Sequence, residues 1–279
     1  MLPFTEITLP VLTKIFFINF ILLTLRYLFF SGIAFGIFWM WKKKYFEPYR
    51  IQSKFPESSK IKTEIIYSIS TFFIFALVGV GIYVARITGN TKIYLSISDY
   101  GYPYFFFTIV LSIVLHDAYF YFIHRLMHQK LLFKHVHMVH HYSNNPSPFA
   151  AFSFHPIEAV LEAGIVPLIV VTFPIHPLAI LSLLLFMTLL NVLGHLGYEL
   201  YPNNFVKSKW TNWNNTSTHH NLHHQKFNCN YGLYFNWWDK LFNTNHESYS
   251  NEFIRITKNR DEILNSKKEL LKSKLSPSL

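Results

Sequence analysis

Histidines in three short motifs are the residues of this sequence that could carry chemistry. The first motif is His124-x-x-x-His128, and a spacing of four places both rings on one face of a helix. The second and third motifs share the pattern H-x-x-H-H, whose histidines would also share a helix face. They consist of His137, His140 and His141 and of His220, His223 and His224. Imidazole nitrogens are common ligands of transition metals, so the motifs predict a metal site.

The repeated motif is too specific to follow from composition alone. With 15 histidines in 279 residues, one H-x-x-H-H motif is expected by chance roughly 0.04 times in such a chain. Eight imidazoles exceed the four ligands of one tetrahedral zinc ion and suit two metal ions with positions left open for O2 and substrate. Zinc has no redox chemistry, so oxidation of an unactivated C–H bond at this site would require iron.

We expect structural or exposed positions for five of the seven histidines that fall outside these motifs. They are His116, His135, His176, His219 and His246. Adventitious metal binding and ordinary buried polar positions are the alternatives for the eight histidines of the motifs. The single cysteine, Cys229, excludes an intrachain disulfide and a cysteine-based zinc site. The predicted chemistry therefore depends on histidine.

The composition favours an integral membrane protein. Hydrophobic residues make up 51% of the chain, aromatic residues 19% and charged residues only 14%, which argues against a large soluble domain. Apolar segments predict membrane helices at 11–41, 65–87 and 104–124, and a hairpin of two helices at 157–194 around a proline turn. The net charge of +10 is spread between these segments, so anionic lipid rather than nucleic acid is the expected partner.

The predicted topology brings all the motifs to one side of the membrane. Three lysines at 42–44 end the first apolar segment, and the positive-inside rule places them in the cytoplasm. Counting spans from there puts 124–155 and everything after His195 on the same side. We expect an all-α integral membrane protein with four to five membrane-embedded helices and a cytoplasmic helical cap that carries a histidine-rich di-metal site. The expected parts are N-terminal helices at 1–100, a catalytic domain at 101–250 and a basic tail at 251–279.

The order of the motifs between hydrophobic hairpins resembles the sterol desaturase and fatty acid hydroxylase superfamily of membrane histidine-box di-iron oxygenases. The similarity runs from about Asp117 to Thr244. Its finer marks are Asp117 and Tyr121, the segment His155-Pro156-Ile157-Glu158, Asn191 with His195, and the ending Trp237-Trp238-Asp239-Lys240-Leu241-Phe242. This resemblance implies that the eight histidines of the motifs bind two irons and that His195 is a ninth ligand.

Asp117 and Glu199 are two further candidate site residues. Asp117 lies seven residues before His124 and could accept the N–H of a ligating imidazole, or it could pair with Arg125 or solvent. Relatives that hydroxylate fatty acyl chains are similar but carry a second histidine four residues after the equivalent of His195, where this chain has Glu199. Glu199 could be a metal ligand, a partner that orients His195, or an interfacial acid.

The resemblance implies an enzyme that uses O2 and two iron ions to hydroxylate or desaturate a lipid, with zinc as a substitute in purified protein. The residue at Glu199 favours a sterol or sterol-like substrate, and a fatty acyl or alkylglycerol ether lipid is the alternative. The chain lacks a G-x-G-x-x-G motif, and the family implies a separate cytochrome b5, ferredoxin or flavin reductase as electron donor. A histidine-rich metal transporter or sensor is the alternative from another class. The expected location is a bacterial inner membrane or the endoplasmic reticulum.

Overall fold

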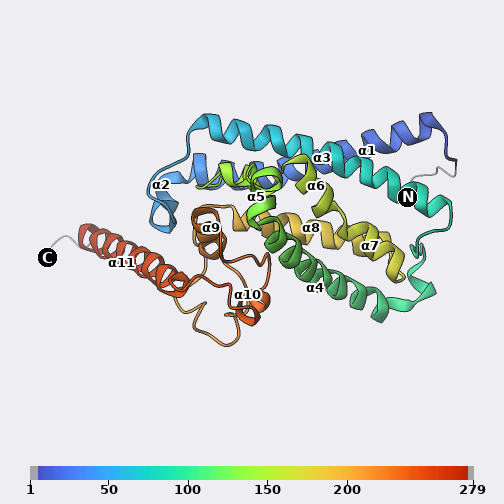
Figure 1. Cartoon of the computed structure of the whole chain (residues 1–279). Helices are drawn as coiled ribbons and strands as arrows, with labels where there is room; N and C mark the ends of the chain where they lie inside the picture. Colours follow the sequence, from blue (N-terminus) through green and yellow to red (C-terminus); the bar gives the residue numbers. More distant parts are fainter. Residues whose placement is uncertain (1–5, 276–279) are drawn as a thin grey trace.

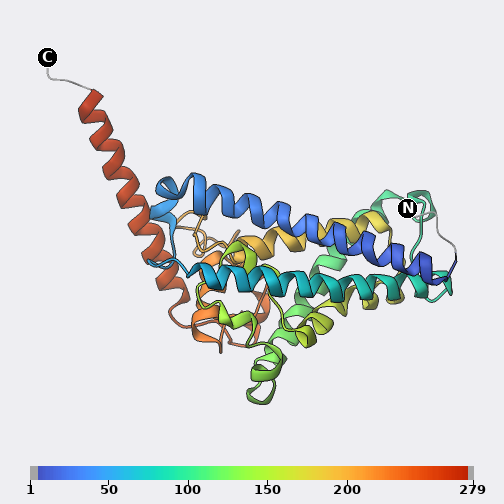
Figure 2. The same ribbon diagram turned by 90° about the horizontal axis from the view of Figure 1, so that it is seen from above.

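A computed structural model describes residues 6–275, and every regular element within that range is a helix. Four of these helices are long and apolar enough to cross a membrane, namely Leu9–Trp41, Ser58–Ile87, Gly101–Met127 and Pro177–Gly194. They form a bundle with a helical cap at one end (Figures 1 and 2). The prediction of an all-helical, multi-pass integral membrane protein is confirmed. Of the predicted parts, 1–5 and 276–279 lie outside the described residues, and the domain boundaries stay a prediction.

The first two spans are longer than the sequence predicted and pack along each other through aromatic rings. The first is α1 (Leu9–Ala34), which continues into a π-helical segment, Phe35–Trp41, and the second is α3 (Ser58–Ile87). Tyr27 of α1 and Phe72 of α3 are fully buried, with ring centroids 5.1 Å apart. The Tyr27 hydroxyl donates to the carbonyl of Phe149 at 3.0 Å. This bond fixes both helices to a short 3-10 segment, Pro148–Phe152.

The third span is α4 (Gly101–Met127), and the predicted hairpin follows with one arm divided. That arm consists of α6 (Pro156–Ala163) and α7 (Ile165–Thr172), and only the second arm, α8 (Pro177–Gly194), is long enough to span. The division at Gly164 has a local cause, because Pro167 has no N–H and fits only the first turn of a helix. Between the arms, His176 caps α8 by accepting from the N–H of Leu178 at 3.1 Å.

The cap is built from four helices that follow the spans. They are α5 (Lys130–Val136), α9 (Ser217–Lys226), α10 (Trp237–Leu241) and α11 (Tyr249–Leu275), joined on the N-terminal side by α2 (Lys43–Phe46). Phe253 of α11 is fully buried against Leu222 of α9, together with Tyr249. Helix α9 carries the third histidine motif, so this small apolar core holds the motif against the rest of the cap.

Replacing Phe253 with alanine should therefore destabilise the cap. The change leaves a cavity beneath α9, and a buried Phe→Ala substitution lowers the free energy of unfolding by about 3–5 kcal/mol. Thermal unfolding of the detergent-solubilised protein measures the effect. Leu270 lies on the same helix and is 56% exposed, so Leu270→Ala serves as the control and should leave the melting temperature nearly unchanged. Equal effects of the two variants would contradict the assignment.

Candidate metal centre

Nine histidine side chains converge in two adjacent clusters beside the cap. The five-histidine cluster contains His124, His128, His137, His141 and His223, and the four-histidine cluster contains His140, His195, His220 and His224. One ring nitrogen of each residue lies within 4.8 Å of those of the other members of its cluster. All nine rings except the half-buried His128 are buried. The sequence-predicted ligand set is brought together completely, and binding of metal by these residues stays a prediction.

Helix α9 supplies both clusters from a single motif. The hydroxyl of Thr216 caps the helix by accepting from the N–H of His219 at 3.2 Å. His220 and His224, one turn apart, belong to the four-histidine cluster, whereas His223 belongs to the five-histidine cluster. The rings of His223 and His224 have centroids 5.7 Å apart. The motif therefore bridges the two clusters.

The second motif also bridges the clusters, but it does not lie on one helix. Helix α5 ends at Val136, and His140 begins a short 3-10 segment, His140–Tyr142. The prediction that its three histidines share a helix face was wrong. His137 and His141 reach the five-histidine cluster and His140 the other. A tight 3-10 turn points successive side chains in more divergent directions than an α-helix does.

Hydrogen bonds fix the tautomers of several rings. The Nδ1–H groups of His124, His195 and His223 donate to the carbonyls of Tyr231 (2.8 Å), Asn191 (2.8 Å) and Cys229 (2.7 Å), respectively. A carbonyl oxygen only accepts, so each Nδ1 carries the proton and each Nε2 of a neutral ring presents a lone pair. Burial, reinforced by neighbouring imidazoles, lowers the pKa of His140, His220 and His224 well below the usual value, which keeps these rings neutral.

Ring nitrogens face one another across both clusters. The Nε2 atoms of His124 and His137 lie 3.0 Å apart, as do those of His195 and His220. The Nδ1–H groups of His124 and His137 both donate to acceptors, so their Nε2 lone pairs repel at this distance unless a cation lies between them. Ligand nitrogens at about 2.1 Å from a shared ion are themselves separated by roughly 3 Å. The donor set therefore fits one metal ion in each cluster, which makes this a candidate di-metal site.

Glu158 contacts the metal centre but was not among the site residues predicted from the sequence. Its Oε1 accepts from Nδ1–H of His137 at 2.7 Å, and both side chains are buried. Such a partner fixes the orientation of a ligating ring and strengthens its donor nitrogen. From the sequence, Glu158 is a family mark at the start of an apolar segment, with capping of the following helix and a catalytic part as equal alternatives. An acid within such a segment was the available signal.

Asp117 and Glu199 hold backbone rather than imidazole rings. Oδ1 of Asp117 accepts from the N–H groups of Tyr234 and Phe235 at 2.8 and 3.2 Å. Oε2 of Glu199 accepts from the N–H and hydroxyl of Thr218 at 3.0 and 2.7 Å. None of these bonds involves a histidine ring. The contacts therefore do not support the prediction that Asp117 or Glu199 orients an imidazole. Glu199 instead anchors the first turn of α9, close to the positive end of the helix dipole.

Asp239 was also missed, and it organises the loop that orients His124. Its carboxylate accepts from the N–H groups of Tyr231 (2.9 Å) and Gly232 (2.7 Å). Burial raises the pKa of Asp239, but hydrogen bonding and the ion pair with His219 outweigh it and lower the value to about 2. A Cβ on Gly232 would lie 2.8 Å from the carboxylate, so the close approach requires glycine.

The five histidines for which structural or exposed positions were expected lie outside both clusters. Nδ1 of His116 lies 3.1 Å from the Tyr234 hydroxyl, and Nε2 of His219 lies 3.5 Å from a carboxylate oxygen of Asp239. Nδ1 of His246 lies 2.7 Å from the Ser248 hydroxyl. His176 caps α8, and His135 is exposed. They have the structural or exposed positions expected from the sequence.

A cavity of about 540 Å³ reaches the four-histidine cluster through His220. It lies between α4 and α8 on the membrane side and the cap on the other, where Trp213 and Trp237 line it. Tryptophan commonly lies at the boundary between lipid and water. A lipid could therefore reach the cluster laterally from the bilayer.

Comparisons with known proteins give a consistent family. Residues 109–244 match the profile of the Fatty acid hydroxylase family. The chain is 29% identical to "Lathosterol oxidase" of Rattus norvegicus over 66% of its own length and 60% of the relative's. It is 30% identical to "Delta(7)-sterol 5(6)-desaturase ERG3B" of Gibberella zeae, over 66% of the chain and 55% of the relative. A similar enzyme of Aspergillus fumigatus, "Delta(7)-sterol 5(6)-desaturase erg3C", is 28% identical over 78% of the chain and 71% of the relative.

The match covers only part of these relatives. The aligned part of the chain spans about 55 to 60% of the length of the first two. No solved structure matches the chain.

The two clusters predict that the protein binds two metal ions, each dependent on its own histidines. His223→Ala should lower the metal content from about two ions per chain to about one or fewer, and His220→Ala should do the same through the other cluster. Elemental analysis of purified protein measures this. His135→Ala, on the exposed surface, is the matched control and should keep both ions. Full metal content in both cluster variants would rule out this assignment.

The anchoring of α9 predicts that Glu199 acts through structure and not as a ligand. Glu199→Gln retains the volume but offers one acceptor oxygen for three donors, the N–H and hydroxyl of Thr218 and the N–H of Tyr201, so the first turn of α9 should loosen. We expect a loss of roughly 1–3 kcal/mol in the free energy of unfolding together with weaker metal retention. Thermal unfolding and metal release to a chelator report the two effects. A variant with unchanged stability that nevertheless loses one ion would identify Glu199 as a ligand.

Proposed function

We propose that this chain, whose residues 109–244 match the fatty acid hydroxylase family, is an O2-dependent, membrane-bound di-iron oxidoreductase that hydroxylates or desaturates a lipid. The observation that carries the proposal is the convergence of nine histidines in two adjacent clusters. Iron in these clusters would supply the redox chemistry that reduces O2 and oxidises a C–H bond, which zinc cannot do. Zinc would occur only as a substitute in purified protein.

The protein's own residues position the donor atoms and keep water away. Two carbonyls and Glu158 hold the Nδ1–H groups of His124, His195 and His137, so that the Nε2 atoms of these rings point inward before any ion binds. The ring of Phe120 packs on His124 with centroids 4.9 Å apart, and Phe154 packs on His140 at 5.4 Å. These apolar side chains cover the two rings and would keep water away from them.

We propose a sterol or sterol-like lipid as the substrate. Two observations support it, the named activities of the relatives and the presence of Glu199 where a second histidine is found in fatty acyl hydroxylases. A fatty acyl or alkylglycerol ether lipid is the alternative within the same architecture. Whether the product is an alcohol or an alkene depends on how the substrate lies in the site.

The remaining parts of the proposal concern the electron donor and the membrane. The electrons would come from a separate cytochrome b5, ferredoxin or flavin reductase that docks on the cap. We place the cap in the cytoplasm, since the lysines at 42–44 lie at the cap end of the first span. The membrane would be a bacterial inner membrane or the endoplasmic reticulum. A metal transporter would need ligands along a path through the spans, whereas both clusters are built from the ends of α4 and α8, residues 137–141 and α9.

The proposal predicts iron-dependent oxidation of a sterol. Iron-loaded protein in lipid vesicles, supplied with a reductase, cytochrome b5 and reduced nicotinamide nucleotide, should convert lathosterol and consume O2. Mass spectrometry of the extracted sterols would identify the product. The double variant His140→Ala and His223→Ala should lower turnover by at least about 100-fold, because each cluster loses a ligand.

Two controls make the outcome decisive. His135→Ala should turn over normally, and zinc-loaded protein should be inactive with its fold intact. Iron-loaded protein that neither consumes O2 nor changes a sterol, fatty acid or ether lipid with any of the three donor types would overturn the proposed function.

A further inference from the structure

A second cavity lies inside the bundle and is nearly all apolar. Its volume is about 260 Å³, and it is lined by residues of α1, α3, α4, α8 and the α6–α7 arm together with Phe152, Phe154 and Leu233. It shares Asn191 and Leu233 with the larger cavity that reaches His220. The two cavities therefore meet at these two residues, and the larger one reaches the metal centre through His220.

One wall of the inner cavity touches the histidine clusters. Phe120 and Phe154 line the cavity and pack on His124 and His140, respectively. Asn191 lines it as well, and its carbonyl accepts from His195. A molecule in this cavity would therefore lie against residues that are in direct contact with both clusters.

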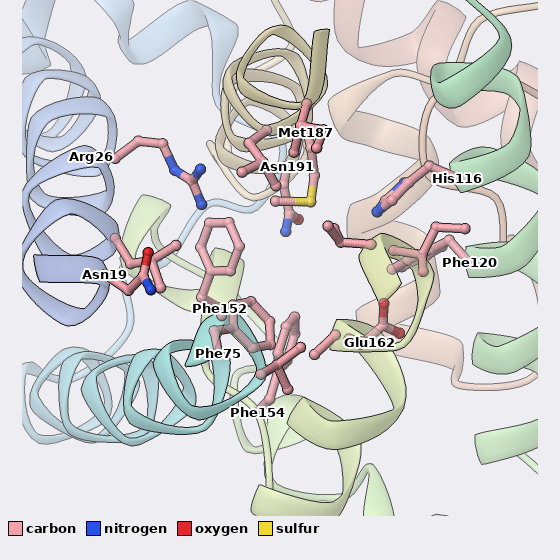
Figure 3. A pocket seen from close by; sticks show the side chains of 18 of the residues that line it. Asn19, Arg26, Phe75, His116, Phe120, Phe152, Phe154, Glu162, Met187 and Asn191 are labelled. Carbon is pink, nitrogen blue, oxygen red and sulfur yellow. The ribbon is translucent and has the colours of Figure 1, made fainter. Parts of the chain in front are cut away.

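The opposite wall carries two polar side chains of α1. Figure 3 shows Arg26 and Asn19 on one side of the cavity, with Arg26 directed into it, and His116 and Glu162 across from them. Nε and Nη2 of Arg26 are buried and have no hydrogen-bond partner among residues 6–275. An arginine within a membrane helix is costly, and such residues usually face a ligand or a partner.

The two unpaired nitrogens of Arg26, Nε and Nη2, are the same pair with which another arginine of this protein binds a carboxylate. Arg255 donates from the same two nitrogens, Nε and Nη2, to the two carboxylate oxygens of Glu252 at 3.0 and 2.5 Å. Arg26 presents this pair of donors to the cavity. Asn19 lies two turns earlier on the same face and can both donate and accept. Gly79 of α3 makes room for it, since a Cβ there would lie 2.7 Å from Asn19 Nδ2.

We infer that Arg26 and Asn19 bind the oxygen-bearing polar end of the lipid substrate, whose apolar body extends across the inner cavity towards the histidine clusters. This inference rests on the proposed function and deepens it. A sterol hydroxyl would accept from Arg26 and donate to Asn19, and a carboxylate would accept from both nitrogens of Arg26. Both residues lie outside 109–244, so the specificity comes from a helix outside the family-matched segment.

Binding without turnover tests the inference. Displacement of tritiated cholestanol from detergent-purified, metal-loaded protein would be measured with unlabelled cholestanol and with cholestane, which lacks the oxygen. Stearate and octadecane form the second pair. In the wild type, the oxygen-bearing lipid of at least one pair should compete at least about tenfold better.

Variants assign this preference to a wall of the cavity. Arg26→Met should abolish it by lowering affinity for the oxygen-bearing lipid and leaving the hydrocarbon unchanged, while Arg26→Lys should restore part of it. Glu162→Gln, on the opposite wall, and Arg255→Met, on the exposed surface, should keep the preference. A preference that survives in Arg26→Met, or one lost in Glu162→Gln alone, would overturn the inference, as would no preference in the wild type.

The outcomes separate the inference from the proposed function. Lathosterol turnover by a wild type that shows no preference would leave the function standing without this recognition site. A preference that depends on Arg26 in a protein inactive towards every lipid would leave the recognition site standing without the function. A preference confined to the stearate pair would support the site and favour an acid over a sterol.

Discussion

The lone pairs of nine neutral imidazoles, gathered within two small volumes, are the interaction on which the rest of the structure depends. The Nδ1–H groups of His124, His137, His195 and His223 donate outward, and Nε2 atoms face one another at 3.0–3.3 Å across the two clusters. This arrangement is unfavourable for the polypeptide alone and favourable around cations. The helices must therefore hold the rings in place against repulsion, and the ions would then join four distant segments of the chain.

Buried acids supply much of that support by binding backbone N–H groups. Asp239 fixes the loop whose carbonyl orients His124, Glu199 fixes the first turn of α9, and Asp117 fixes the backbone after the loop. A buried carboxylate is costly unless several donors surround it. Here each cost is offset by two or more hydrogen bonds that also define where the histidine-bearing segments lie. The acids thus act on the metal centre through the backbone.

Much of the fold and of the site could be predicted from the sequence. Apolar length indicated the spans, and the unusual spacing of histidines indicated the ligand set, because both are local patterns. The division of the hairpin at Gly164 was missed, although Pro167 was visible. The sharing of the second motif between two clusters could not be predicted, since the direction of His140 depends on a 3-10 turn. The partners of Asp117 and Glu199 depend on contacts between segments that are far apart in the sequence.

The sharing of motifs has a consequence for how the cap folds. His140 and His141 are neighbours in the chain but belong to different clusters, and so do His223 and His224. An ion bound in one cluster therefore fixes the backbone that carries ligands of the other, and part of the ordering entropy of the second cluster is already spent when the first is filled. Occupation of the two clusters should on this argument be cooperative. The buried acids contribute to this cooperativity, because their hydrogen bonds hold the loops in place before either ion binds.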